Sequence, residues 1–140
     1  MSPARQDRLT NLAIIALCTA AVSAAAWMRP SESGLGTHEQ LGLPACHFYK
    51  WTGYPCFSCG MTTSWTWMAH GNPLRAFLAQ PMGALLFLTA IVAALWSAWC
   101  LWAGGTVERR MAGRGRLLIA LFWTGMLGGW AWKIVETLRK

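Results

Sequence analysis

Residues 82–103 read MGALLFLTAIVAALWSAWCLWA, and this stretch contains no charged side chain. An α-helix needs about 20 apolar residues to cross the roughly 30 Å of hydrocarbon in a bilayer. Residues 9–28 also lack charge, and residues 117–135 come close, because only Lys133 interrupts them and its amine can reach outward to water. The sequence therefore predicts an all-α integral membrane protein with three transmembrane helices, forming a single membrane domain over residues 1–140.

Composition supports that class, and only the first span has a second interpretation. The chain is 55% hydrophobic and 12% charged, whereas a soluble domain has about 25% charged residues. Arg5 and Arg8 precede the first apolar stretch and Ala24-Ala25-Ala26 resembles a cleavage site, as in a secretory signal peptide. The stretch is longer than the apolar region of most signal peptides, so a retained helix is favoured.

Basic residues predict the orientation of the chain. Arg5 and Arg8 flank the first span, and the loop between the last two spans holds Arg109, Arg110, Arg114 and Arg116. Short cytoplasmic loops are enriched in such residues. We therefore expect a multi-pass protein of a bacterial inner (cytoplasmic) membrane, with a cytoplasmic N-terminus and residues 29–81 on the outer side, although Arg139 and Lys140 at the outer end oppose this. The net charge of +7 is then a topology signal, and no nucleic-acid partner is expected.

The outer segment is expected to contain two short helices. Residues 61–70 are apolar and rich in Trp but too short to span a bilayer, so they predict a half-helix that Ser58 caps and Gly71 ends. Asn72 and Pro73 then suit the cap and first turn of an interfacial helix. We expect one face of that helix to be apolar and the other polar: Leu74, Phe77 and Leu78 against Arg75 and Gln80.

The order of markers in this segment resembles a family of small bacterial membrane proteins catalogued as domain of unknown function 2752. The markers are Cys46, Thr52-Gly53, Cys56, Cys59-Gly60, Thr62, His70-Gly71 and Pro81. The resemblance covers roughly residues 43–103 and departs from the family pattern at Phe57, Thr63 and Gln80-Pro81. It implies a three-helix membrane fold and no known activity. Structural roles are expected for Gly60, Thr62, Gly71, Pro73 and Pro81.

The three cysteines of the outer segment allow several interpretations. Thiols on the outer side of an inner membrane tend to pair, so Cys46 is a candidate partner of Cys56 or Cys59 in a structural disulfide. The alternative is a metal site in which all three thiolates bind zinc or copper(I), with His47 or His70 as fourth ligand. Beyond zinc or copper(I), the sequence suggests no cofactor.

Two further interpretations concern redox chemistry and docking. Cys56 and Cys59 precede a helix, whose N-terminal partial charge stabilises a thiolate, so a thiol–disulfide oxidoreductase is an alternative function. Redox turnover needs a partner pair, and Cys18 and Cys100 lie within spans, where they are expected to pack as small apolar residues. Enzyme activity therefore remains uncertain and is not favoured.

The last interpretation is that the cysteines serve only the fold. Ten Trp residues offer packing faces toward lipid or other helices, and Gly125 and Gly129 form a G-x-x-x-G motif for helix packing. The expected partners are the lipid bilayer and other membrane-protein subunits or a second copy. The function favoured from sequence is a non-enzymatic accessory or partner-binding subunit of a larger membrane assembly, with a structural cysteine knuckle on its outer face.

Overall fold

The computed structural model describes residues 2–106 and 113–139, and this part of the chain is helical without strands. Its elements in chain order are α1 (Pro3–Trp27), the 3₁₀ helix η1 (Thr37–Leu41), α2 (His47–Thr52), α3 (Met61–Ala69), α4 (Pro73–Ala79), α5 (Pro81–Ala103) and α7 (Gly115–Leu138). The helices α1, α5 and α7 are each long and apolar enough to cross a membrane. The all-α fold with three transmembrane helices is therefore confirmed.

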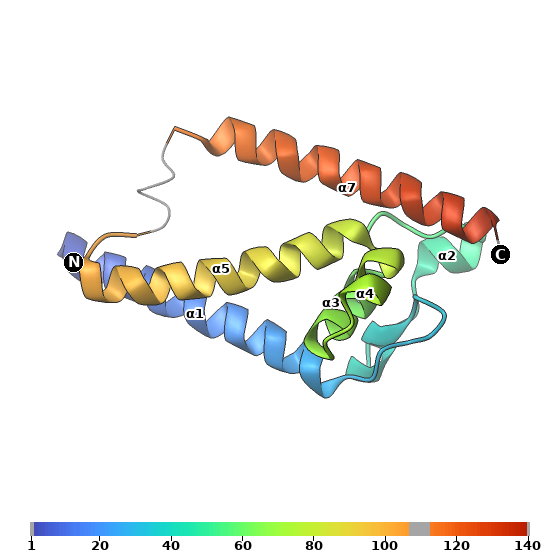
Figure 1. Cartoon of the computed structure of the whole chain (residues 1–140), viewed down its shortest axis with the longest axis horizontal. Helices are drawn as coiled ribbons and strands as arrows, with labels where there is room; N and C mark the ends of the chain where they lie inside the picture. Colours follow the sequence, from blue (N-terminus) through green and yellow to red (C-terminus); the bar gives the residue numbers. More distant parts are fainter. Residues whose placement is uncertain (1, 107–112, 140) are drawn as a thin grey trace.

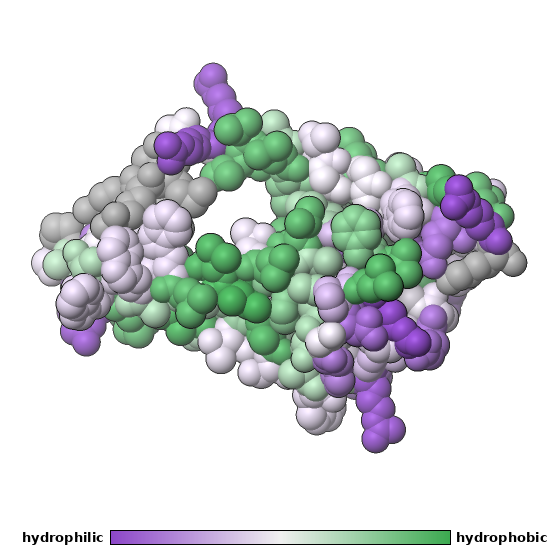
Figure 2. Space-filling view, in the orientation of Figure 1, coloured by the Kyte–Doolittle hydropathy of each residue, from purple (hydrophilic) through white to green (hydrophobic). Residues whose placement is uncertain are grey.

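The three long helices place all the short elements at one end of the molecule. Figure 1 shows α1 and α5 side by side, with α7 approaching them mainly where α5 begins. The start of α1 lies at the end opposite η1, α2, α3 and α4, and the last turns of α7 lie at the same end as these short helices. Figure 2 shows hydrophobic residues over the middle of the long helices and hydrophilic residues gathered toward the ends, as a membrane-spanning protein requires.

The ends of the short helices follow from local sequence, with one exception. Asn72 caps α4, its side chain accepting the Arg75 backbone N–H at 3.5 Å, and Pro73 occupies the first turn. Gly71, with a φ of 74°, follows the last turn of α3. The prediction that Ser58 caps α3 is wrong, because the residue at that position is Gly60 and the Ser58 hydroxyl lies against Cys56 instead.

Helix α3 is polar toward the protein and apolar toward its surroundings. Thr63, Ser64 and Thr66 are buried, while Trp65 is partly exposed and packs edge-on against Phe87 of α5, with ring centroids 5.5 Å apart. The Thr63 hydroxyl is hydrogen-bonded to that of Thr37 at 2.8 Å, and the Ser64 hydroxyl donates to the Gln80 carbonyl at 3.0 Å. These bonds hold a nine-residue helix against the spans.

Helix α4 presents its apolar face outward. Leu74, Phe77 and Leu78 are exposed, whereas Ala76 and Ala79 are buried against the protein. The expectation that Gln80 shares a polar face with Arg75 is wrong, because Gln80 is fully buried whereas Arg75 is exposed. Its amide is needed inside the protein, where it donates to the backbone carbonyl of Phe57 at 3.2 Å. Arg75 remains outside and pairs with Glu32 at 2.8 Å.

The start of α5 packs closely against α7 at the two glycines of the G-x-x-x-G motif. A Cβ added at Gly125 would lie 2.6 Å from the sulfur of Met82, and one added at Gly129 would lie 2.8 Å from the Gln80 side-chain oxygen. By contrast, a Cβ at Gly128 would meet no atom within 4 Å. The motif therefore lies where two helices of the same chain approach each other.

Lys133 does not reach outward to water as the sequence suggested. Its side chain is buried, and its ammonium donates to the Glu136 carboxylate at 2.8 Å. Helix α7 continues through Leu138, beyond the predicted end at residue 135, so this acid lies in the same helix. The ammonium lies 2.9 Å from where a Cβ of Gly34 would stand. It can stay charged in this buried place because the Glu136 carboxylate pairs with it.

Arg5 and Arg8 belong to α1, and Arg114 and Arg116 lie at the start of α7, at the end of the molecule opposite the short helices. Arg109 and Arg110 fall outside the described residues. Arg5, Arg8, Arg114 and Arg116 lie where the predicted orientation requires basic residues, whereas Arg29, Lys50, Arg75 and Arg139 lie at the opposite end, with the short helices.

Candidate metal centre

The loop that carries Cys56 and Cys59 is held by one side chain from α7 and by another from the junction of α4 and α5. The indole N–H of Trp130 in α7 donates to the carbonyl of Pro55 at 2.9 Å. The amide of Gln80, immediately before α5, donates to the carbonyl of Phe57. These two bonds fix the Pro55–Cys56 and Phe57–Ser58 peptides, so the backbone is held just before Cys56 and one residue after it. Trp130 and Gln80 were not predicted as site residues, and no local motif marks them.

A turn then brings Cys59 beside Cys56. The Cys59 backbone N–H donates to the Cys56 carbonyl at 3.0 Å, and the two Sγ atoms stand 3.2 Å apart. Gly60 follows with a φ of 87°, in the left-handed region, and its carbonyl accepts the Ser64 N–H at the start of α3. A Cβ at Gly60 would lie 2.8 Å from the carbonyl oxygen of Ala79, so glycine is required for both reasons.

Cys46 reaches the same place from a separate segment. It immediately precedes α2, and its Sγ and those of Cys56 and Cys59 all lie within 4.8 Å of one another. Cys59 is buried, and the other two are partly exposed. The three cysteines are free thiols. Hereafter these three residues are called the thiol cluster.

The thiols of Cys56 and Cys59 differ in acidity. For Cys56, burial opposes ionisation, but hydrogen bonds from the Ser58 hydroxyl and the Cys59 thiol outweigh it, so its pKa is lowered. For Cys59, burial and the hydrogen bond with Cys56 raise the pKa to about 12. When the pair loses one proton, the negative charge therefore resides on Cys56, with the remaining proton on Cys59.

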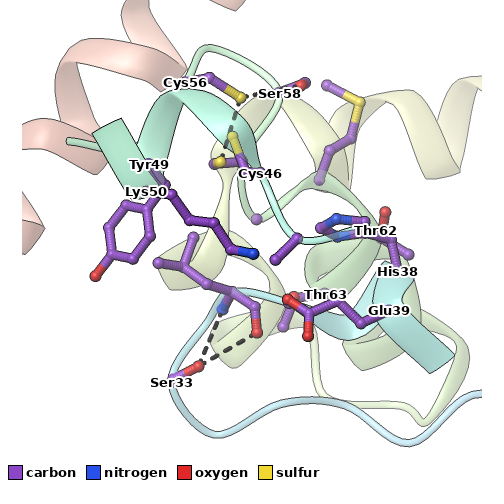
Figure 3. A pocket seen from close by; sticks show the side chains of 16 residues that line it. Ser33, His38, Glu39, Cys46, Tyr49, Lys50, Cys56, Ser58, Thr62 and Thr63 are labelled. Atoms are coloured by element: carbon purple, nitrogen blue, oxygen red, sulfur yellow. Dashed lines mark hydrogen bonds between the residues drawn. The ribbon is translucent and has the colours of Figure 1, made fainter. Parts of the chain in front are cut away.

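The thiol cluster forms part of the wall of an open cavity of about 700 Å³. The same cavity is lined by side chains from η1, α2 and α3: His38, Glu39, Tyr49, Lys50, Thr62 and Thr63. Figure 3 shows the His38 imidazole and the Lys50 amine extending into it from opposite walls. Ligands from solution therefore have access to the sulfurs.

The predicted histidines lie elsewhere. His70 follows the last turn of α3, and its Nδ1 lies 2.8 Å from the carbonyl of Thr66. The rise of α3 is about 13 Å, so His70 stands at the opposite end of that helix from the thiol cluster. His47 is exposed, does not line the cavity and is not grouped with the cysteines. Neither is placed as a ligand. His38, which no sequence motif singles out, instead lines the cavity that contains the sulfurs.

The remaining residues singled out from the sequence have simpler positions. Thr62 lines the cavity, and Gly71, Pro73 and Pro81 lie at helix ends. Cys18 in α1 and Cys100 in α5 are free and lie within the spans, the latter buried.

Residues 46–94 match the family model described as Protein of unknown function (DUF2752). The resemblance predicted from the sequence is thereby confirmed over a segment that begins at Cys46 and contains the whole thiol cluster, α2, α3, α4 and the first part of α5. No curated protein and no solved structure matches the chain.

Proposed function

We propose that this chain is a multi-pass membrane protein that binds one zinc or copper(I) ion through Cys46, Cys56 and Cys59. The observation that carries the proposal is the convergence of three sulfur atoms, from two separate segments, within 4.8 Å of one another. Zinc–thiolate bonds are about 2.3 Å long, which puts the sulfurs of a tetrahedral site about 3.8 Å apart. The thiol cluster needs only small shifts to reach that geometry.

The chemistry of the cluster supports a soft or borderline ion. Thiolates select copper(I) and zinc over magnesium and calcium. Binding must displace the proton from Cys59, whose pKa is about 12, so affinity should rise with pH as proton competition weakens. Lys50 in the cavity wall supplies positive charge that offsets the excess negative charge of a three-thiolate complex.

We further propose that the site faces outward from a bacterial inner membrane. The support is the position of Arg5, Arg8, Arg114 and Arg116 at the end opposite the thiol cluster, since basic residues favour the cytoplasmic side. The accessory role in a larger assembly stays a prediction. The exposed apolar side chains of α7, among them Leu117, Ile119, Leu121 and Trp123, are open to lipid or to another membrane helix.

A titration in mild detergent tests the metal site. Purified protein is reduced, freed of metal and titrated with zinc against a chromophoric chelator of known affinity. The unaltered chain should bind one zinc, and Cys46→Ser should weaken binding by about 100-fold or more, since even outer-shell partners are worth 10–100-fold. Cys18→Ser, in the middle of α1, is the matched control and should change nothing. Equal affinity in the unaltered chain and Cys46→Ser would contradict the proposal.

Thiol–disulfide exchange by Cys56 and Cys59 is the second candidate, because their Sγ atoms are 3.2 Å apart and their pKa values are split. The more acidic, more exposed thiol would act as nucleophile. Oxidation of both thiols to a disulfide releases two protons and two electrons, so a disulfide or a quinone would have to accept them. Metal binding is favoured because Cys46 lies within the same group.

The split in acidity predicts the order in which the metal-free thiols react. The thiolate is the reactive form, so a lowered pKa lets Cys56 react at a pH where an ordinary thiol is mostly protonated, while Cys59 stays protonated until far above neutrality. Brief treatment with iodoacetamide at pH 7–8, followed by peptide mass mapping, should therefore label Cys56 at least about tenfold faster than Cys59. Equal labelling, or Cys59 first, would show that the acidity is not divided in this way.

A further inference from the structure

We infer that His38 is the fourth ligand of the proposed metal site, completing a Cys₃His set through Nδ1. The inference rests on the proposed function and adds to it a residue and a coordination number. Zinc in closed protein sites takes four ligands, commonly three thiolates and one imidazole. The thiol cluster supplies three, so the remaining ligand must come from the cavity that the sulfurs line.

Among the chain's three histidines, His38 is the one that lines this cavity. It is partly buried, and Figure 3 shows its ring turned into the cavity with the sulfurs of Cys46 and Cys56 at the far wall. Glu39 also lines the cavity, but it is exposed to solvent, and a carboxylate is a harder ligand than the imidazole of His38. Lys50 cannot serve as a ligand while it is protonated.

The hydrogen bond of the imidazole leaves the correct nitrogen available. The Nε2 of His38 lies 3.3 Å from the carbonyl oxygen of Pro44. An oxygen acceptor there requires Nε2 to carry the proton, so Nδ1 keeps its lone pair. Histidine ligands in metal sites usually donate their other ring N–H to a carbonyl or carboxylate in this way. Pro44 is two residues before Cys46, so the bond also ties His38 to the segment that delivers one of the thiols.

The backbone position of His38 is fixed by its neighbour. Thr37 is buried, and its hydroxyl is bonded to that of Thr63 in α3 at 2.8 Å and accepts the Ser31 backbone N–H at 3.2 Å. Helix η1 is thereby anchored on the first turns of α3, the end at which Cys59 and Gly60 stand. The His38 ring lies outside the group of sulfurs, so η1 and the segment that contains Pro44 and Cys46, which the His38 hydrogen bond joins, must move together toward the other two sulfurs when the ion binds.

Cobalt(II), a spectroscopic substitute for zinc, tests the ligand set directly. The metal-free chain, His38→Ala, His38→Cys and the control His47→Ala are loaded with Co²⁺ in detergent, and their visible spectra and zinc affinities are compared. The unaltered chain and His47→Ala should show the intense visible bands of a tetrahedral site. His38→Ala should lose that intensity while keeping the sulfur-to-cobalt charge-transfer band, and its zinc affinity should fall about 100-fold.

His38→Cys offers a fourth soft ligand and should restore a tetrahedral spectrum, shifted to longer wavelength. Thermal unfolding of the metal-free variants shows that folding is intact. An unchanged spectrum and affinity in His38→Ala would overturn the role of His38 while leaving the thiolate site in place. Failure of the unaltered chain to bind Co²⁺ or zinc would overturn both proposals together.

Discussion

Replacing Glu136 with Gln should lower the free energy of unfolding by about 3–5 kcal/mol, because it removes the carboxylate that compensates a buried ammonium. The Lys133 side chain is 2% exposed and the Glu136 side chain is 25% exposed. The lysine amine lies near Gly34, in the loop between α1 and η1. Without its carboxylate, the ammonium must either stay charged in a poorly solvated place or lose its proton. Thermal unfolding in detergent, followed by circular dichroism, measures the loss.

The same exposed fractions predict that replacing Lys133 and replacing Glu136 cost different amounts of stability. Lys133→Met keeps an apolar stem and leaves a carboxylate that water reaches, so it should cost less than Glu136→Gln. Glu32→Gln is the matched control, because it breaks the Arg75–Glu32 pair, whose side chains are 49% and 79% exposed. Exposed pairs contribute about 0–1 kcal/mol. If Glu32→Gln and Glu136→Gln cost the same, Lys133 does not depend on its partner.

Replacing Gly60 with Ala should destabilise the outer segment by about 2–5 kcal/mol and abolish metal binding at micromolar zinc. The left-handed backbone, with its φ of 87°, costs an L-residue about 1–2 kcal/mol. Overpacking adds about 1–3 kcal/mol, because the new Cβ would stand 2.8 Å from the Ala79 carbonyl and 3.1 Å from that of Gly34. Any backbone shift that relieves these contacts also moves Cys59, the preceding residue.

Gly53→Ala separates the two costs of the Gly60 substitution. Gly53 also has a left-handed backbone, with a φ of 72°, but a Cβ there meets no atom within 4 Å. It should therefore show only the backbone penalty of about 1–2 kcal/mol and keep its metal affinity. The free energy of unfolding and the zinc affinity are measured for both variants. Equal effects of the two substitutions would contradict the close packing around Gly60.

The fold was largely predictable because its main signals are local. The charge-free stretch at residues 82–103 nearly coincides with α5, Pro81–Ala103, since the cost of exposing polar groups to lipid is set within one helix. Asn72 and Gly71 likewise mark helix ends through their own backbone and side-chain chemistry. Helix α1 begins before residue 9, and α7 begins before residue 117 and continues past residue 135, because polar residues near a membrane surface can remain helical.

The predictions that were wrong or missing concern side chains that make tertiary contacts. Lys133 and Gln80 are polar residues at places where a helix of this class usually meets water or headgroups. Their burial depends on Glu136 and on the carbonyl of Phe57, partners that no periodicity of the sequence reveals. Cys46, Cys56 and Cys59 could be grouped from the sequence alone. The candidate ligand His38 lines their cavity because η1 packs on α3 through the Thr37–Thr63 hydrogen bond, and no sequence pattern reveals that contact.

The measurement that tests the metal site most directly is the intact mass of protein purified without reductant or chelator, recorded in the native state and again after alkylation. A metal site predicts one zinc or copper per chain, and thiols at Cys46, Cys56 and Cys59 that become alkylatable only after a chelator removes the ion. A metal-free chain whose mass is two hydrogens short, with one outer thiol still open to alkylation, would contradict it and establish a disulfide between two of the three.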